Sequence, residues 1–137
     1  QTRYYKVYYL KIKVTRLMPK KKIAKIDLKD AIIKGMQEKK AHKITILDLR
    51  KLKVSMADFF IICHGNSDKQ VSAIAHSIEE EVRKHVGEKP WHVEGTETSE
   101  WILMDYIDMV VHIFQEEKRD FYGIEELWGD ADITVVE

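Results

Sequence analysis

The chain has 137 residues, a length typical of one domain, and its 23 Lys and Arg balance 23 Asp and Glu to a formal net charge of zero. A single cysteine, Cys63, excludes an intrachain disulfide and a thiolate cluster for zinc or iron. No apolar run approaches the roughly 18 residues of a membrane span and no signal-peptide pattern is present, so we expect a soluble, cytoplasmic protein.

Charge divides unevenly along the chain. Residues 1–53 carry 17 Lys and Arg against 4 Asp and Glu, whereas residues 54–137 carry 6 against 19. If folding keeps the two signs apart, this asymmetry favours steered binding to a highly charged partner. Because residues 1–25 hold nine basic residues and no acid, we interpret them as a basic N-terminal arm and residues 26–137 as a single domain.

The first half of the domain predicts a helix followed by two strands. Asp27 is placed to cap a helix over residues 28–41, where apolar side chains recur at four-residue intervals. Residues 43–49 and 58–63 have the length and the β-branched or aromatic content of strands. A basic linker joins these two strands.

A glycine corner leads into a second predicted helix. Apolar side chains hold helical spacing from Val71 to Val86, and Gly87 is placed as the stop. Ser67 is the expected N-cap, and Gln70, three residues on, completes a capping-box pattern.

The remaining residues predict three strands and a short helical segment. A short strand is expected over residues 91–95, and residues 101–114 read as two strands around a tight turn. A helical turn or two is expected over residues 116–128, with Phe121, Ile124, Leu127 and Trp128 as its apolar side. The fold class is therefore α/β, bordering on α+β, with a mixed sheet of about five strands flanked by helices.

The glycine corner has two interpretations. Gly65, Asn66 and Ser67 precede a helix, where backbone amides favour an anion. The segment CHGNSDKQ lacks the second glycine and the lysine position of a P-loop. We therefore favour a structural corner over a phosphate site.

No catalytic or metal constellation emerges from the other polar residues, so we expect no cofactor. His76 and His85 are nine residues apart, which does not suit a metal pair on one helix. Asp105 and Asp108 lie on opposite faces of a strand or across a turn. Cys63 is expected to be a buried structural thiol and His112 a hydrogen-bonded core histidine.

Three segments carry a family resemblance: ADFFIICHGNSDKQV (57–71), EGTETSEWILMDYIDMVVHIF (94–114) and DFYGIEELWGDA (120–131). Their order and spacing resemble those of the Iojap family, the ribosomal silencing factors, over about Leu28 to Ala131. The resemblance implies a nucleotidyltransferase-like core without that enzyme's catalytic acids. It also implies binding to the large ribosomal subunit through its protein fourteen, which blocks subunit association and represses translation, and organellar relatives assist large-subunit assembly.

The family's partner-binding motifs match this chain on the hairpin and on the C-terminal segment. The matching residues are Trp101, Met104, Asp105, Tyr106, Asp108, His112, Phe114, Tyr122, Leu127 and Trp128. Among these we expect Trp101, Asp105 and Asp108 to protrude, because a tryptophan beside carboxylates is typical of a protein-binding hot spot. The family usually has glycine where this chain has Ile107, so a positive φ there would strain the turn.

Two other functions stay open. One is a nucleotidyltransferase-like enzyme that binds a triphosphate at residues 65–67 and a metal ion at Asp105 and Asp108. The other is an RNA-binding module built on residues 1–25. Peripheral contact of the lysine-rich half with ribosomal RNA, and a homodimer formed through the apolar hairpin, are both compatible with the family resemblance.

Overall fold

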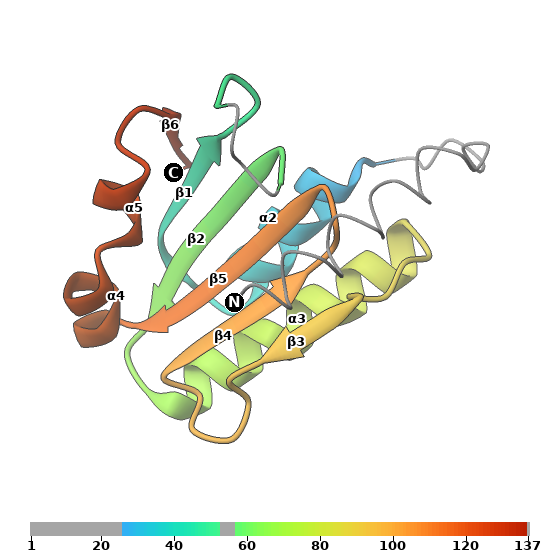
Figure 1. Ribbon diagram of the computed structural model, residues 1–137. Coiled ribbons are helices and arrows are strands. Elements are labelled where there is room, and N and C mark those ends of the chain that lie inside the picture. The colour runs from blue at the N-terminus through green and yellow to red at the C-terminus, as the bar shows by residue number, and fades with distance from the viewer. Residues whose placement is uncertain (1–25, 53–56, 137) are drawn as a thin grey trace.

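A computed structural model describes residues 26–52 and 57–136, and the predicted arm of residues 1–25 lies outside that range. The helices are α2 (Leu28–Glu38), α3 (Asp68–His85), α4 (Glu116–Tyr122) and α5 (Ile124–Leu127). The strands are β1 (His42–Asp48), β2 (Phe59–Gly65), β3 (His92–Glu94), β4 (Trp101–Asp105), β5 (Met109–Gln115) and β6 (Asp132–Val135). They form one sheet in the order β3-β4-β5-β2-β1-β6, in which only β2 and β5 run parallel (Figure 1).

The central strands account for the apolar runs of the sequence. β2 and β5 pair in parallel over all seven residues of each strand. Residues 60–65 are buried, as expected for a strand covered on both faces. β2 extends two residues beyond the predicted end at Cys63, because its pairing with β5 continues through His64 and Gly65.

Helices α2 and α3 pack side by side against one face of the sheet (Figure 1). The predicted N-caps are confirmed: Asp27 and Ser67 each accept a hydrogen bond from the backbone N–H three residues on, at 2.8 and 3.1 Å. The two helices approach closely at Gly35, where an added Cβ would lie 2.6 Å from the Ile78 Cα. Glycine is therefore required there by packing.

Buried side chains form two clusters, one on each face of the sheet. The larger lies between the sheet and helices α2 and α3, and it includes Ile61 and Met104. The smaller lies on the opposite face, where Phe60, Phe114 and Ile124 are among its members. The second cluster is closed by the C-terminal segment, so that segment is part of the fold.

The predicted α/β class with a mixed sheet flanked by helices is confirmed, but the sheet has six strands instead of about five. The missed strand is β6, which pairs antiparallel with β1. All four β6 residues are exposed, so the strand shows none of the alternating burial that marks most strands. None of the described helices has the length and hydropathy of a membrane span.

Candidate functional site

The corner between β2 and α3 is filled by the protein's own groups. Gln70 Oε1 accepts a hydrogen bond from the Asn66 N–H at 2.7 Å, and Gln70 Nε2 donates to the carbonyls of Lys39 and Lys40 at 3.1 and 3.2 Å. The predicted capping box is thus half formed, because the Gln70 side chain reaches Asn66 and Ser67 only accepts. One amide of the supposed anion nest is already bonded, which favours the structural interpretation of this corner.

The turn between β4 and β5 is strained at Ile107, the position where the family resemblance implies glycine. Ile107 has a φ of 81°, a rare conformation for a β-branched residue. Asp105 Oδ1 accepts a hydrogen bond from the Ile107 N–H at 2.7 Å, and the Asp108 N–H donates to the Tyr106 carbonyl at 3.1 Å. The carboxylate of Asp105 therefore stabilises the turn from inside.

Half of the predicted partner-binding side chains are buried. Their exposed fractions are 1% for Met104, 0% for Asp105, 2% for Tyr106, 4% for His112 and 0% for Phe114. The prediction that Asp105 protrudes is therefore wrong. The physical reason is that both faces of β4 and β5 are covered: alternate side chains enter the helix-side core, and the others enter the opposite cluster.

The groups considered for chemistry do not converge. Asp108 is exposed at the hairpin tip while Asp105 is buried in the turn. Within residues 26–52 and 57–136, no three His, Cys, Asp or Glu side chains are grouped as a metal ion would require. Cys63 is a buried thiol, as predicted, and burial raises its pKa to about 12.

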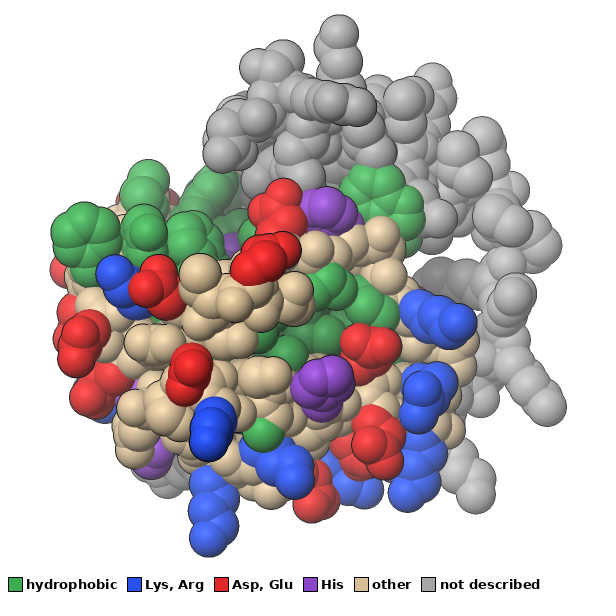
Figure 2. All heavy atoms as spheres, turned by 90° about the horizontal axis from the view of Figure 1, so that it is seen from below, with side chains coloured by type: hydrophobic (Ala, Val, Ile, Leu, Met, Phe, Trp, Pro, Cys, Tyr) green, Lys and Arg blue, Asp and Glu red, His purple; other side chains and the backbone are tan. Residues whose placement is uncertain are grey.

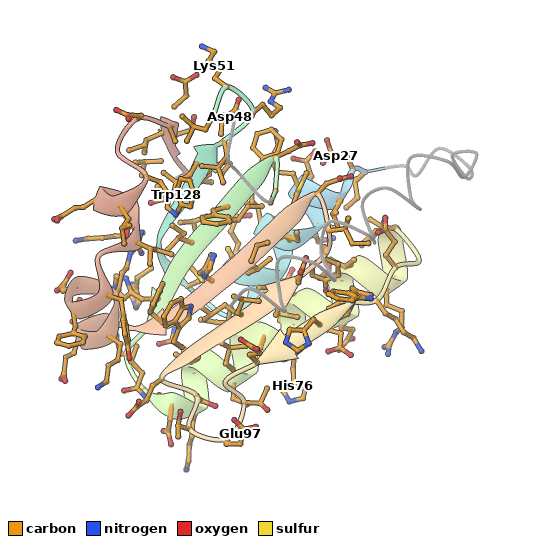
Figure 3. The ribbon with its side chains drawn as sticks, in the orientation of Figure 1. Asp27, Asp48, Lys51, His76, Glu97 and Trp128 are labelled. Atoms are coloured by element: carbon orange, nitrogen blue, oxygen red, sulfur yellow. The ribbon has the colours of Figure 1, made fainter. Side chains whose placement is uncertain are left out.

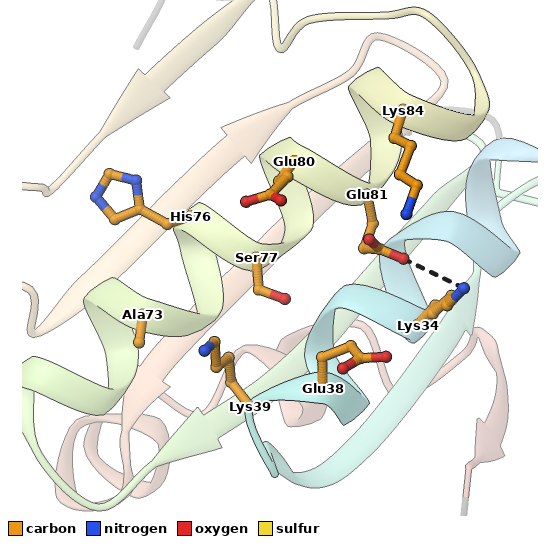
Figure 4. A pocket seen from close by; sticks show the side chains of 9 residues that line it. All are labelled: Lys34, Glu38, Lys39, Ala73, His76, Ser77, Glu80, Glu81 and Lys84. Atoms are coloured by element: carbon orange, nitrogen blue, oxygen red, sulfur yellow. Dashed lines mark ion pairs between the residues drawn. The ribbon is translucent and has the colours of Figure 1, made fainter.

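A groove of about 510 Å³ lies between α2 and α3 (Figure 4). Its side chains are mostly charged and of both signs, and Lys34 Nζ lies 3.4 Å from Glu81 Oε1. Ser77 Oγ donates to the Gly35 carbonyl at 2.8 Å and so joins the two helices. Because lysines and glutamates alternate around it, the groove has the character of a solvated helix–helix seam.

An aromatic cluster lies on the sheet face opposite α2 and α3. Trp101 Nε1 donates a hydrogen bond to His112 Nδ1 at 3.1 Å, which confirms the predicted hydrogen-bonded core histidine. The Trp101 ring centroid lies 4.9 Å from that of Phe114 and 4.7 Å from that of Tyr122. Burial lowers the pKa of His112 to about 3, so the imidazole stays neutral and continues to accept from the indole.

Arg119 fastens α4 to the sheet. Its guanidinium forms two hydrogen bonds with Glu125, at 2.8 and 3.0 Å, and donates to Thr45 Oγ1 at 3.1 Å. A further bond of 3.0 Å joins Arg119 Nη1 to His64 Nδ1. Because arginine is always protonated, the imidazole accepts this bond; burial and the Arg119 charge lower the pKa of His64.

The sequence patterns did not single out Arg119. It stands in the charged run EEKRD, where a surface position is the usual expectation, yet it is only 7% exposed. The sequence offers only a weak signal for the buried ion pair: Arg119 stands six residues before Glu125, with Gly123 between them.

The C-terminal segment exposes large apolar side chains. Phe121 is 78% exposed, Leu127 74% and Tyr122 43%, whereas Ile124 is buried, so the residues of the predicted apolar side do not all face the core. Trp128 is half-buried, with its ring 5.7 Å from that of Phe60 (Figure 3). We call Trp101, Phe121, Tyr122, Leu127 and Trp128 the C-terminal surface.

Acidic residues border this surface. Glu116, Glu117, Asp120 and Glu126 are exposed on α4 and α5. In the space-filling view, hydrophobic side chains gather at the upper left, on the side where α4 lies in Figure 1, with acidic side chains beside them (Figure 2). Asp108 lies away from the C-terminal surface, because the length of β4, about 13 Å, separates Trp101 from the hairpin tip.

Comparison with known proteins decides the family. The family model described as ribosomal silencing factor during starvation matches residues 22–137. The chain belongs to this family. A ribosomal silencing factor of Halalkalibacterium halodurans is 40% identical over 111 residues, covering 81% of this chain and 93% of that protein. The Bacillus subtilis ribosomal silencing factor is 42% identical over 97 residues, covering 71% and 80%.

The fold agrees with that of solved structures. A crystal structure of a protein from Chromobacterium violaceum superposes with a TM-score of 0.70 at 35% identity, covering 74% of this chain and 83% of that chain. The segment matched by the ribosomal silencing factor family contains the whole sheet and the C-terminal surface. The resemblance carried by three motifs therefore extends over residues 22–137.

Proposed function

We propose that this chain is a ribosomal silencing factor that binds the large ribosomal subunit and prevents its association with the small subunit. Family membership over residues 22–137 is the observation that carries the proposal. Protein fourteen of the large subunit is the docking partner that the family resemblance implies. On this proposal the chain acts by steric exclusion and makes or breaks no bond.

The C-terminal surface supplies the contact in this proposal. Exposed apolar patches on monomeric proteins mark interaction sites, and Phe121 and Leu127 are each more than 70% exposed. A Trp and a Tyr held by neighbouring rings present large contact area with little conformational entropy left to lose. The bordering acids suit a basic ribosomal protein and would accelerate encounter.

Four of the five buried motif residues have an indirect part in this proposal. Phe114 and His112 hold Trp101 in place, while Asp105 and Tyr106 shape the hairpin. Asp108 is a candidate for contact with ribosomal protein, and the lysine-rich half is a candidate for peripheral contact with ribosomal RNA.

Sedimentation of purified subunits tests the proposal. The protein should co-migrate with the large subunit and, when added first, should leave large and small subunits separate under conditions that otherwise join them. Full re-association in the presence of saturating protein would contradict silencing. Co-migration with the small subunit alone would contradict the proposed partner.

The rival enzymatic function has no specific support in the described residues, because Asp105 bonds the turn and Gln70 fills the glycine corner. Isothermal titration with magnesium nucleotides measures it directly. We expect no heat of binding, and micromolar nucleotide affinity would favour the enzyme instead.

A further inference from the structure

His64 lies where the C-terminal segment, Glu116 to Trp128, meets the sheet. It stands near the end of β2, where α4 packs against β2 and β5 (Figure 1). Only 3% of the residue is exposed. Every member of the C-terminal surface except Trp101 lies on this segment. The way in which the segment is attached at His64 therefore determines whether the C-terminal surface is assembled.

One hydrogen bond requires His64 to be neutral. Arg119 Nη1 lies 3.0 Å from His64 Nδ1, and because a guanidinium only donates, this imidazole nitrogen carries a lone pair. The single ring proton is then on Nε2, which lies 3.5 Å from Glu116 Oε2. A second proton would occupy Nδ1, so it would remove the acceptor and place two positive charges at hydrogen-bonding distance.

The charges around His64 oppose a second proton. Arg119 faces the ring from α4, while His42 and Lys43 face it from β1. The ring centroids of His42 and His64 lie 5.4 Å apart. Glu116 on α4 favours protonation, but its carboxylate is mostly exposed. Burial and then the Arg119 charge lower the pKa of His64, so the attached segment favours the neutral ring.

Detachment of the segment would remove the groups that disfavour a charged ring. Arg119 would leave together with Glu125 on α5, to which it forms two hydrogen bonds. The exposed His64 would then regain a pKa near its ordinary value of 6.5. Because the detached state binds a proton more tightly, acid shifts the equilibrium toward it. The equilibrium constant for detachment rises by up to about tenfold per pH unit between 6.5 and the lowered pKa of the attached state.

We propose that His64 is a positioning residue that makes the C-terminal surface sensitive to acid: its neutral ring accepts from Arg119 and keeps α4 and α5 on the sheet, and its protonation detaches them. The consequence for ribosome binding rests on the proposed function. Detachment separates Tyr122 from Trp101, whose ring centroids lie 4.7 Å apart, and so lowers the affinity for the large ribosomal subunit. Attachment itself is a property of the free protein and is measured without the ribosome.

Hydrogen exchange of the free protein tests the attachment. The amides of Gly123 and Trp128 are the reporters, because they donate to carbonyls within α4 and α5 at 3.0 and 3.2 Å, and helices this short do not persist once detached. From about pH 7.5 to about pH 5.5, the protection factors of both amides should fall at least threefold.

Three variants make this measurement specific to His64. In His64→Gln, whose amide oxygen accepts from Arg119 but does not titrate, the two protection factors should stay nearly constant. His76→Gln, an exposed histidine on α3, is the matched control and should fall like the parent protein. Glu116→Gln should fall more steeply, because it removes the carboxylate that favours a charged ring. Constant protection in the parent, an undiminished fall in His64→Gln, or a shallower fall in Glu116→Gln would overturn the proposal.

Affinity for purified large ribosomal subunits connects this equilibrium to the proposed function. Since apparent affinity scales with the attached fraction, the parent protein should lose at least about twofold more affinity than His64→Gln between the same two pH values. Equal losses would contradict the link between His64 and ribosome binding. If the parent protein binds at neither pH, the proposed function fails, and the exchange measurement still decides whether His64 attaches the segment.

Discussion

The β4–β5 hairpin and the α4–α5 segment both carry aromatic side chains of the family motifs, yet they differ in exposure. On the hairpin, Met104, Tyr106 and Phe114 are buried, whereas Phe121 and Leu127 on the C-terminal segment are largely exposed. The hairpin strands lie inside a sheet covered on both faces, while α4 and α5 are short helices with one side against the sheet. The apolar residues of the family motifs therefore have two roles: some are buried and support the surface from the core, and others are exposed and form the surface itself.

Stability measurements on one residue from each region test this division most strongly. Met104→Ala should lower the free energy of unfolding by about 2–5 kcal/mol, because it leaves a cavity in the helix-side core. Leu127→Ala should change it by less than about 0.5 kcal/mol. Urea unfolding of both variants makes the comparison, and equal losses would show that the two regions do not differ in this way.

Arg119 joins the α4–α5 segment to strands β1 and β2, so its replacement should have the next largest effect. Arg119→Met should cost about 2–3 kcal/mol, since the side chain of Glu125 loses its partner and the acceptors at Thr45 and His64 are left unpaired. Limited proteolysis should then cut near α4 first. Glu125→Gln is the matched control, and it should lower the free energy of unfolding by less. If Arg119→Met were as stable as the parent protein, the Arg119 contacts would not be required for the fold.

Lowering the pH should reduce the stability of the fold through the buried His112. The folded-state pKa of His112 is lowered from 6.5 to about 3, so the unfolded chain binds more protons between these values and stability falls as the pH drops below about 6.5. His64, also lowered, acts in the same direction. From roughly pH 7 to pH 5, His112 should account for about 2 kcal/mol. The decrease should be visibly shallower in His112→Gln, and an identical slope would contradict the assignment.

The smallest expected effect is a gain. Ile107→Gly should raise stability by about 0.5–1 kcal/mol, because relief of a left-handed backbone outweighs the entropy cost of glycine. Thermal unfolding of this variant measures the strain. A lower melting temperature would mean that the packing of the Ile107 side chain is worth more than the strain.

The sequence predicts those features of the fold that depend on residues close together in the chain. The caps at Asp27 and Ser67, the stop at Gly87 and the turn at Ile107 all depend on neighbours within a few residues. The sequence does not predict strand β6, because its pairing partner β1 lies more than eighty residues earlier in the chain. Its four side chains are also all exposed and so lack the alternating pattern of a strand.

The candidate site was less predictable for the same reason. The sequence indicated which residues match the family's motifs but not which side of a covered sheet each one faces. A tryptophan beside carboxylates is typical of a protein-binding hot spot, which placed Asp105 outside, yet its carboxylate accepts a hydrogen bond from the Ile107 N–H within the strained turn. The apolar pattern of residues 116–128 groups Phe121 with Ile124, yet Phe121 is exposed and Ile124 is buried.

Binding to the large ribosomal subunit tests the central claim most directly. The affinity of purified large subunits should be measured for the parent protein, for Tyr122→Ala with Leu127→Ala, and for Glu80→Ala in the groove between α2 and α3. We expect at least a tenfold loss for the double variant, which is about 1.4 kcal/mol, and no change for Glu80→Ala. A folded double variant that binds as tightly as the parent would contradict the account.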